Sequence, residues 1–129
     1  MANELVAKVE ITSREETVYD EPSAGPKLAR VVIHRTFTGD LEGQSVANLL
    51  LCQGEGGGGY MSSERFTGSI GGKSGTVVFH HGRVNGGTEP LQFGEIIPNS
   101  GTDELQGIAG SVNFAFSPAG ASVTLTVSS

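Results

Sequence analysis

Hydrophobic and polar residues alternate along most of this chain, which is the pattern of β-strands with one buried face. The first segment places apolar residues on one face and charged residues on the other: Leu5, Ala7, Val9 and Ile11 against Glu4, Lys8 and Glu10. A second strand is predicted over residues 27–38, and further strands over residues 44–53, 60–67, 74–81, 91–97, 111–116 and 122–127. In residues 44–53 the apolar positions also fit a helical turn, so both interpretations stay open there.

Two longer connections separate these strands. Residues 15–26 are rich in charge and end in Pro22, Gly25 and Pro26, so they are predicted to form a loop. Residues 99–110 form the other connection, with a short turn of helix expected around Asp103–Leu105. Eight strands of this length can close on themselves, which removes the unpaired edges of an open sheet. We therefore expect one all-β domain over residues 1–129, a closed eight-stranded antiparallel β-barrel with a lipocalin-like meander.

Glycine is unusually frequent, at 20 of 129 residues, where average usage gives about nine. A repeat of the form Gly-x-aliphatic-x-Gly accounts for part of this excess, in residues 39–43, 68–72 and, more loosely, 82–86. Each copy lies where two predicted strands join, and glycine supplies the positive φ of a tight turn there. We expect the central aliphatic residue of each copy to close an end of the barrel.

Charge and composition exclude several classes of function. A net charge of −6 leaves no basic surface for phosphates, so no nucleic-acid partner is expected. The longest strongly apolar run, residues 49–52, is too short to span a membrane, and the N-terminus lacks the features of a signal peptide. Cys52 is the single cysteine, so an intrachain disulfide is excluded. We expect a cytoplasmic protein with no membrane partner.

Three motifs imitate known chemistry without its structural context. Residues 54–59 satisfy the dinucleotide pattern GxGxxG, but a strand is predicted to follow them where the motif needs a helix. Residues 68–74 end in Gly-Lys-Ser like a P-loop, yet they are one residue short between the glycines and also lead into a strand. His80 and His81 are neighbours on a strand, so they point to opposite faces and cannot share one metal ion. We expect hairpin turns at the glycines, and no cofactor or metal.

A series of short motifs runs in order along nearly the whole chain. They are Tyr19-Asp20, Gly25-Pro26-Lys27-Leu28, Gly39-Asp40-Leu41-Glu42-Gly43, Glu64-Arg65-Phe66-Thr67-Gly68, Gly72-Lys73-Ser74-Gly75 and Pro98-Asn99-Ser100-Gly101-Thr102-Asp103-Glu104-Leu105-Gln106-Gly107. With these motifs the chain resembles a bacterial family, domain of unknown function 3224. The resemblance implies an allene oxide cyclase-like barrel. Barrels of that type include allene oxide cyclase, spirotetronate cyclases and plant dirigent proteins, which steer the cyclisation or coupling of small apolar molecules.

The chain also departs from the pattern of that family. Asn99 and Asp103 stand where glycine is expected, and the strand before Pro98 carries Glu95 in place of an aromatic residue. Because the resemblance places this strand beside a cavity, it implies a changed ligand. The family implies no settled activity, and no catalytic residue carries over from the enzymes with similar barrels.

Polar residues that interrupt apolar faces are the candidate catalytic groups. Glu95 shares a face with Phe93, and a buried carboxylate without a partner has a raised pKa that suits a general acid or base. The alternatives for Glu95 are a face that points to solvent or a pair with an arginine. Glu64 shares a face with Tyr60 and is the second candidate, with a structural arginine pair as its alternative. His34 is the third, because imidazole titrates near neutral pH, although a solvated histidine fits the same position.

These residues lead to a functional prediction. We expect a cofactor-independent cyclase or isomerase that acts on a small apolar metabolite held in the barrel, with a carboxylate or His34 moving a proton. Arg30 and Arg65 are expected to stabilise developing negative charge. Tyr60 and Phe93 are expected to contact the ligand, and Tyr19, in the loop over residues 15–26, to cap the cavity.

Two other functions stay open. The chain could be a carrier or sensor that binds a similar ligand without changing it, or a structural module whose barrel is filled by side chains. A homodimer that pairs through an outer face is expected for a barrel of this type.

Overall fold

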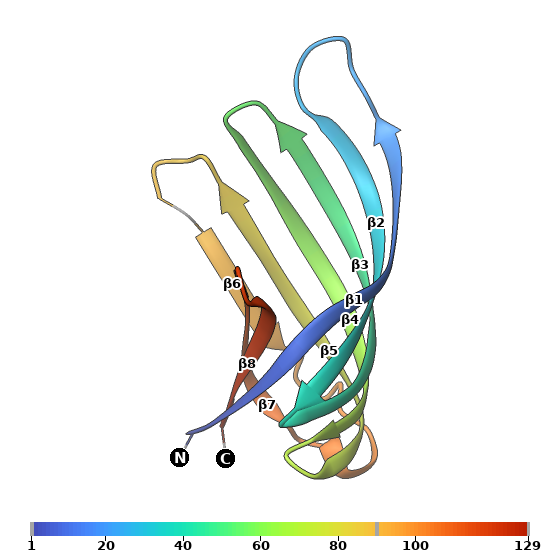
Figure 1. Ribbon diagram of the computed structural model, residues 1–129, viewed down its shortest axis with the longest axis vertical. Helices are drawn as coiled ribbons and strands as arrows, with labels where there is room; N and C mark the ends of the chain where they lie inside the picture. Colours follow the sequence, from blue (N-terminus) through green and yellow to red (C-terminus); the bar gives the residue numbers. More distant parts are fainter. Residues whose placement is uncertain (1, 90, 129) are drawn as a thin grey trace.

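The computed structural model describes residues 2–89 and 91–128. Within these ranges eight antiparallel strands follow one another around a ring (Figure 1): β1 (Ala2–Asp20), β2 (Lys27–Gly39), β3 (Leu41–Gly54), β4 (Gly57–Ile70), β5 (Lys73–Asn85), β6 (Leu91–Ile96), β7 (Ala109–Ser117) and β8 (Gly120–Ser128). A 3-10 helix, η1 (Asp103–Leu105), precedes β7 where the helical turn was predicted. The all-β class and the eight antiparallel strands are confirmed.

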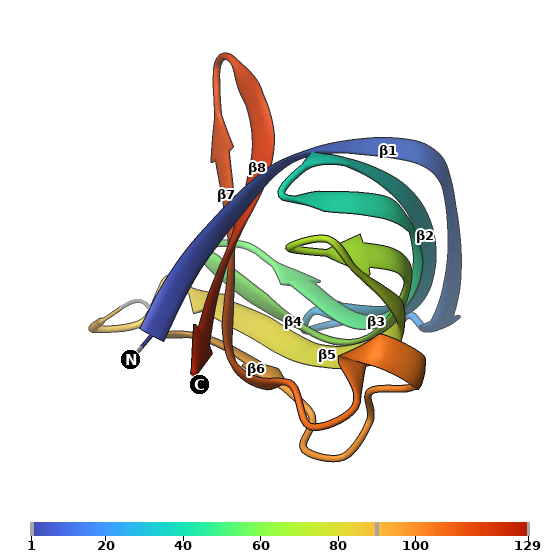
Figure 2. The same ribbon diagram turned by 90° about the horizontal axis from the view of Figure 1, so that it is seen from below.

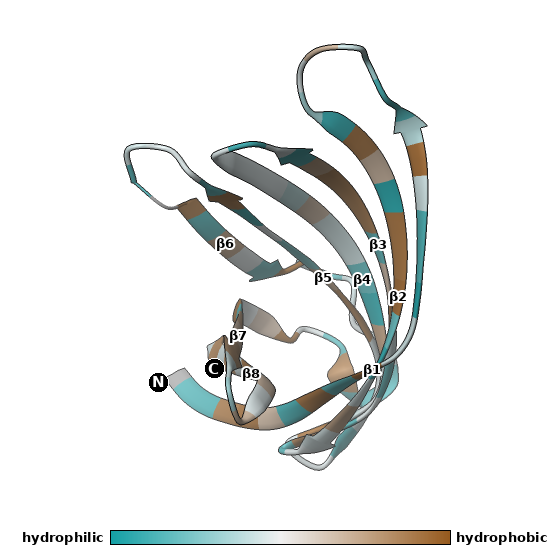
Figure 3. Ribbon diagram, turned by 45° about the horizontal axis from the view of Figure 1, so that its top comes forward, coloured by the Kyte–Doolittle hydropathy of each residue, from teal (hydrophilic) through white to brown (hydrophobic). Residues whose placement is uncertain are grey.

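The strands meet more fully at one end of the ring than at the other. At the lower end, which holds η1 and the termini, β1 pairs with β8 through residues 2–9. Beyond residue 9 the pairing of β1 is with β2, and β6 meets β7 in the described residues through a single pair, Glu95 with Ser111. Figures 1 and 3 show β2 to β5 rising beyond β7 and β8 as a curved sheet. From below, the strands curve around a common interior and the β7–β8 hairpin extends past it (Figure 2).

Aromatic side chains fill the lower interior. Phe66 and Phe79 are completely buried, and their rings stack with centroids 6.2 Å apart. Phe37 meets Phe66 edge-on at 5.2 Å. Such aromatic pairs contribute about 0.5–1.5 kcal/mol beyond their buried area. Leu105 of η1 packs into the same cluster, so the long connection before β7 is fixed to the core.

The glycine repeats close the lower end of the ring, as predicted, but not the upper end. Leu41 and Ile70 are the central residues of the first two copies, and they are 0% and 3% exposed in the lower core. Val84, in the third copy, is 47% exposed near the upper end of β5. For Val84 the prediction is wrong, since its side chain lies on the outer face of the sheet.

Strand β1 is longer than the sequence pattern predicted. It continues through residues 15–20, so the predicted loop is wrong over these residues and Tyr19 lies in a strand, whereas residues 21–26 do form a loop. A register shift between Ile11 and Ser13 interrupts its pairing with β2. After this shift Arg14 and Glu16 lie opposite inward-facing residues of β2. The charges that resembled a loop belong to a strand edge, where charged side chains discourage pairing with another chain.

The remaining turns follow the sequence analysis. Residues 44–53 lie within β3, so the strand interpretation is confirmed and the helical one is wrong. Both glycine-rich motifs form hairpin turns, between β3 and β4 and between β4 and β5, and each leads into a strand.

In the described residues, Asn99 (φ 64°) and Asp103 (φ 53°) are the non-glycine residues with positive φ. Both were identified as replacing glycine, and asparagine and aspartate tolerate this conformation best. No helix in this part of the chain has the length and hydrophobicity needed to cross a membrane.

Candidate functional site

The inner face of the upper sheet has an aliphatic side and a polar side. Residues paired directly across antiparallel strands share a face, so the inner face can be followed as rows. One row consists of Val18, Ala29, Leu51, Tyr60, Arg83 and Gln92, and the next of Glu16, Val31, Leu49, Ser62, His81 and Gly94. In both rows β2 and β3 supply aliphatic side chains, whereas β4 and β5 supply polar ones. A molecule on this face would meet both kinds of surface.

Glu64 is the centre of a buried polar cluster. Its side chain is 0% exposed, and its Oε1 accepts hydrogen bonds from Arg35 Nη1 at 2.7 Å and from His81 Nε2 at 2.8 Å. The hydroxyl of Ser45 donates to Oε2. The four side chains come from β2, β3, β4 and β5, so the cluster ties neighbouring strands together. A buried charge is tolerated because it is paired and hydrogen-bonded in this way.

The pKa of Glu64 lies below its ordinary value. Burial raises the pKa of this carboxyl, but the hydrogen bonds from His81 and Ser45 and the positive charge of Arg35 outweigh burial. The group is therefore ionised at neutral pH. It can orient and stabilise its partners, but as a carboxylate it has no proton to give.

A hydrogen-bonded chain leads from Glu64 towards the upper end of the ring. A carboxylate only accepts hydrogen bonds, so Nε2 of His81 carries the proton that it shares with Glu64. The other ring nitrogen, Nδ1, lies 3.3 Å from the hydroxyl of Tyr60. Tyr60 is half-buried and is the most exposed member of the chain. Burial raises the pKa of Tyr60, against the opposing charges of Arg35 and Arg83, so its hydroxyl keeps its proton at neutral pH.

Ser62 lies beside this chain with an unused hydroxyl. It is 5% exposed, and in the described part of the chain its Oγ is the buried side-chain atom that has no hydrogen-bond partner. Ser62 pairs directly with His81 across β4 and β5, so both side chains belong to one row. A buried hydroxyl without a partner costs about 1–3 kcal/mol. The polar atom of a bound molecule would satisfy it.

Phe114 of β7 supports the cluster from across the ring. Its ring centroid lies 4.4 Å from that of His81, and the guanidinium carbon of Arg35 lies 4.9 Å from the centre of the Phe114 ring. The second contact is a cation–π interaction. The orientation of Arg35 and His81 therefore depends on the β7–β8 hairpin as well as on the upper sheet.

The residues predicted from sequence fall on two faces. Glu64 and Tyr60 lie on the inner face and belong to one network. The other candidates are on the outer face: Glu95, Phe93, His34, Arg30, Arg65 and Tyr19. Glu95 is exposed and lies opposite His80, so the interior position expected for its strand is wrong and the solvent-facing alternative holds. His80 bonds to Ser63 outside while His81 points inside, as predicted.

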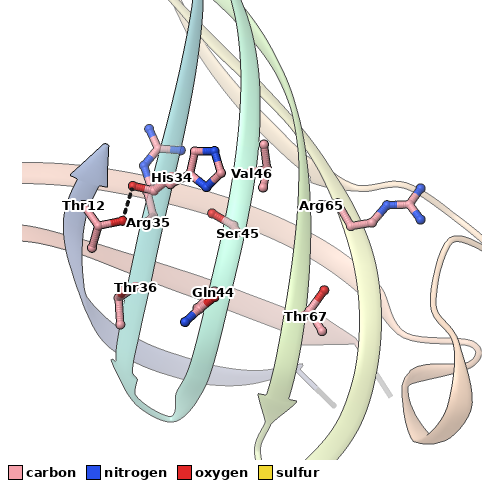
Figure 4. A pocket seen from close by; sticks show the side chains of 9 residues that line it. All are labelled: Thr12, His34, Arg35, Thr36, Gln44, Ser45, Val46, Arg65 and Thr67. Atoms are coloured by element: carbon pink, nitrogen blue, oxygen red, sulfur yellow. Dashed lines mark hydrogen bonds between the residues drawn. The ribbon is translucent and has the colours of Figure 1, made fainter. Parts of the chain in front are cut away.

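Some of the outer residues do lie near one another. His34 and Arg65 line an open hollow of about 650 Å³ on β2 to β4, with Val46 between them (Figure 4). Polar side chains such as Gln44 also line this hollow. Tyr19 lines a separate, smaller hollow of about 280 Å³ among apolar side chains. Arg35 and Ser45 of the Glu64 cluster also line the first hollow, and Tyr60 also lines the second. Glu64 and His81 line neither of these two hollows.

Sequence analysis missed Arg35, Ser45 and His81. The alternation already carried the signal, because Arg35 lies two residues from the apolar residues Ile33 and Phe37, both of which are buried. His81 stands in the same relation to buried Phe79. The reasoning that selected Glu64, a charged residue within an apolar face, would have selected Arg35 as well.

A family model and a solved structure match this chain. The model of the DUF3224 family, described as a protein of unknown function, matches residues 6–127. A crystal structure of a protein with unknown function from the DUF3224 family, from Shewanella oneidensis MR-1, is similar over 99% of this chain and 97% of that chain. The TM-score is 0.88 and the sequence identity is 23%, so this likeness shows the fold alone. A comparison with curated proteins gives no match.

Proposed function

The chain belongs to the DUF3224 family, whose description names no activity, and we propose its function from its own site. It binds a small, largely apolar molecule on the inner face of the upper sheet and moves a proton on that molecule. This makes it a cofactor-independent isomerase or cyclase. The observation that carries the proposal is the hydrogen-bonded chain Tyr60–His81–Glu64.

The aliphatic side of the inner face suits the body of the molecule. Val31, Ile33, Ala47 and Leu49 form a buried cluster that is separate from the lower core, with Leu51 and Tyr60 packed against it. Leu51 and Tyr60 are only partly buried. An apolar ligand therefore reaches the cluster from the upper end and gains about 25 cal/mol for each Å² of apolar surface removed from water.

The polar side suits proton transfer. Tyr60 takes a proton from the bound molecule as its own hydroxyl proton passes to Nδ1 of His81. Glu64 stabilises the imidazolium that forms and fixes the ring throughout, as a carboxylate does behind a catalytic histidine. The proton returns along the same chain to another position of the molecule. An isomerisation of this kind consumes no proton and no cofactor.

A carrier is the second candidate, and the complete pairing of Glu64 favours it. Every hydrogen bond of the cluster could serve stability alone, with Ser62 as the group that recognises a ligand. A filled structural module fits less well, because it gives no reason for the unpartnered hydroxyl. A closed barrel of the allene oxide cyclase type and a cytoplasmic location remain parts of the proposal.

Copurification followed by deuterium exchange tests the function. The chain is purified from its own host, the small molecule it carries is identified by native mass spectrometry, and that molecule is incubated with the chain in D₂O. We expect deuterium to enter a C–H bond of the molecule with the unmodified chain and with His80→Gln, whose ring lies outside. With His81→Gln the rate falls by about 100-fold or more. A bound molecule that gains no deuterium identifies a carrier.

A further inference from the structure

One arginine of the inner face, Arg83, is not neutralised by the carboxylates of that face. Arg14 pairs with Glu16 at 2.9 Å, and Arg35 pairs with Glu64. Glu16 also pairs with Lys27 at the upper rim, whose Nζ lies 3.9 Å from Oε2 of Glu16. Arg83 lies on the same face, and within the described residues it makes no ion pair. A chain with a net charge of −6 thus keeps surplus positive charge on its inner face.

Arg83 is partly buried, and a hydrogen-bonded network holds its guanidinium. Its Nη2 donates to Oε1 of Gln92 at 2.9 Å, and Nε2 of Gln92 donates in turn to Oδ1 of Asn113 at 2.6 Å. The two amide partners are uncharged, and the network joins β5, β6 and β7. Arg83 is directly opposite Tyr60 in the pairing of β4 and β5, and Ser62 is the next inward residue of β4. A fixed guanidinium and an unpartnered buried hydroxyl therefore lie in adjacent rows.

We propose that the molecule bound at this site is a small organic acid. Its carboxylate pairs with Arg83 and accepts a hydrogen bond from Ser62, while its apolar body lies on Leu49 and Leu51. The inference rests on the proposed function, and it adds the chemical class of the ligand.

A cationic or a neutral ligand fits the same residues less well than an organic acid does. A cation would face Arg83 and Arg35, and among the described residues of this face the carboxylates Glu64 and Glu16 already have partners. A neutral apolar molecule would leave Arg83 without a counter-charge. A carboxylate satisfies both Arg83 and Ser62, and the planar guanidinium suits a carboxylate through two parallel hydrogen bonds.

Three probes with the same eight-carbon body separate these classes: octanoate, octanol and octylamine. Binding is followed through the NMR signal of the His81 ring, in the unmodified chain, in Arg83→Gln, and in Lys8→Gln as a control that removes one charge from the outer face. We expect octanoate to bind at least about tenfold more tightly than octanol or octylamine, and Arg83→Gln to lower this preference to about twofold or less. Lys8→Gln keeps the full preference. Unchanged His34 and His80 signals establish that each variant is folded.

Two kinds of result overturn the inference. Equal affinity for octanoate and octanol at His81 excludes an acid as the ligand. A full preference for octanoate in Arg83→Gln excludes Arg83 as the group that pairs with its carboxylate. Both results leave binding on the inner face intact. If no probe moves the His81 signal at saturating concentration, or if the His34 signal moves in its place, both the inference and the proposed binding site are wrong.

Discussion

His81 donates a hydrogen bond from Nε2 to Oε1 of Glu64 over 2.8 Å, and both side chains are buried inside the ring at 3% and 0% exposure. They lie on neighbouring strands, two residue pairs apart in the register of β4 and β5, so both point to the inner face. The same oxygen of Glu64 also accepts from Arg35, so one carboxylate positions two side chains from opposite sides. The same atoms therefore stabilise the ring and take part in the proposed proton transfer.

Replacing Glu64 with glutamine tests the structural part of this relationship. The amide keeps the shape of the side chain but leaves Arg35 as an unpaired buried charge, so we expect the free energy of unfolding at pH 7 to fall by about 3–5 kcal/mol. Urea unfolding measures this change. Glu95→Gln makes the same chemical change on the outer face and should stay within about 0.5 kcal/mol of the unmodified chain. Equal effects of the two substitutions would contradict the buried pair.

The contribution of Glu64 to the free energy of unfolding decreases at low pH. Its pKa is lower in the folded chain than the ordinary value of 4.5, so the stabilisation is fully present above pH 4.5 and is lost as the pH falls through the folded-state pKa. We expect the stability difference between the unmodified chain and Glu64→Gln to be constant near neutral pH and to shrink below pH 4.5. Urea unfolding at a series of pH values measures it. A difference that grows on acidification would show a raised pKa and contradict the cluster.

Two buried serines, Ser45 in the Glu64 cluster and Ser62 beside it, should respond in opposite directions to substitution by alanine. Ser45 donates to Glu64, so Ser45→Ala leaves a carboxylate oxygen short of a donor and costs about 1–3 kcal/mol. Ser62 has no partner among the described residues, so Ser62→Ala removes an unsatisfied hydroxyl and should stabilise the chain by about 1 kcal/mol. Thermal unfolding of both variants is the measurement. A loss at Ser62 as large as that at Ser45 would mean that its hydroxyl already has a partner.

The lower turns depend on a close approach of two glycines. Gly43 and Gly68 pair across β3 and β4, and a Cβ on Gly43 would lie 2.2 Å from the carbonyl oxygen of Thr67. Gly43→Ala should therefore lower the free energy of unfolding by about 1–3 kcal/mol. Gly87→Ala is the control, because the nearest atom to its Cβ would be 3.9 Å away. Urea unfolding that gives the same value for both variants would contradict the close approach.

Alternation predicted the order and type of the strands, because the lower ring has one buried face along each strand. It did not predict that β1 continues to Asp20, since a strand edge protected by charge has the composition of a loop. It also could not assign the faces of β6. Ile96 points inward, but Leu91 and Phe93 lie outward and exposed, so both faces of this short strand contain apolar residues. The choice of Glu95 as an interior carboxylate followed from that ambiguity.

The candidate site was predicted only in part for a related reason. Glu64 and Tyr60 share a strand, so their common face could be identified within one segment. Arg35 reaches Glu64 from β2 across the intervening β3, and this contact depends on the curvature of the sheet. Curvature and register are properties of the assembled strands, which a single segment does not encode.

The most direct test of a ligand site on the inner face uses the three histidines of the chain as reporters. His81 lies in the inner cluster, whereas His34 and His80 are on the outer face. Imidazole NMR signals are recorded while octanoate is added to the unmodified chain. The proposed site predicts that the His81 signal shifts in a saturable way while the other two stay in place. A shift of His34 with His81 unmoved, or no shift of His81 at saturating octanoate, would contradict it.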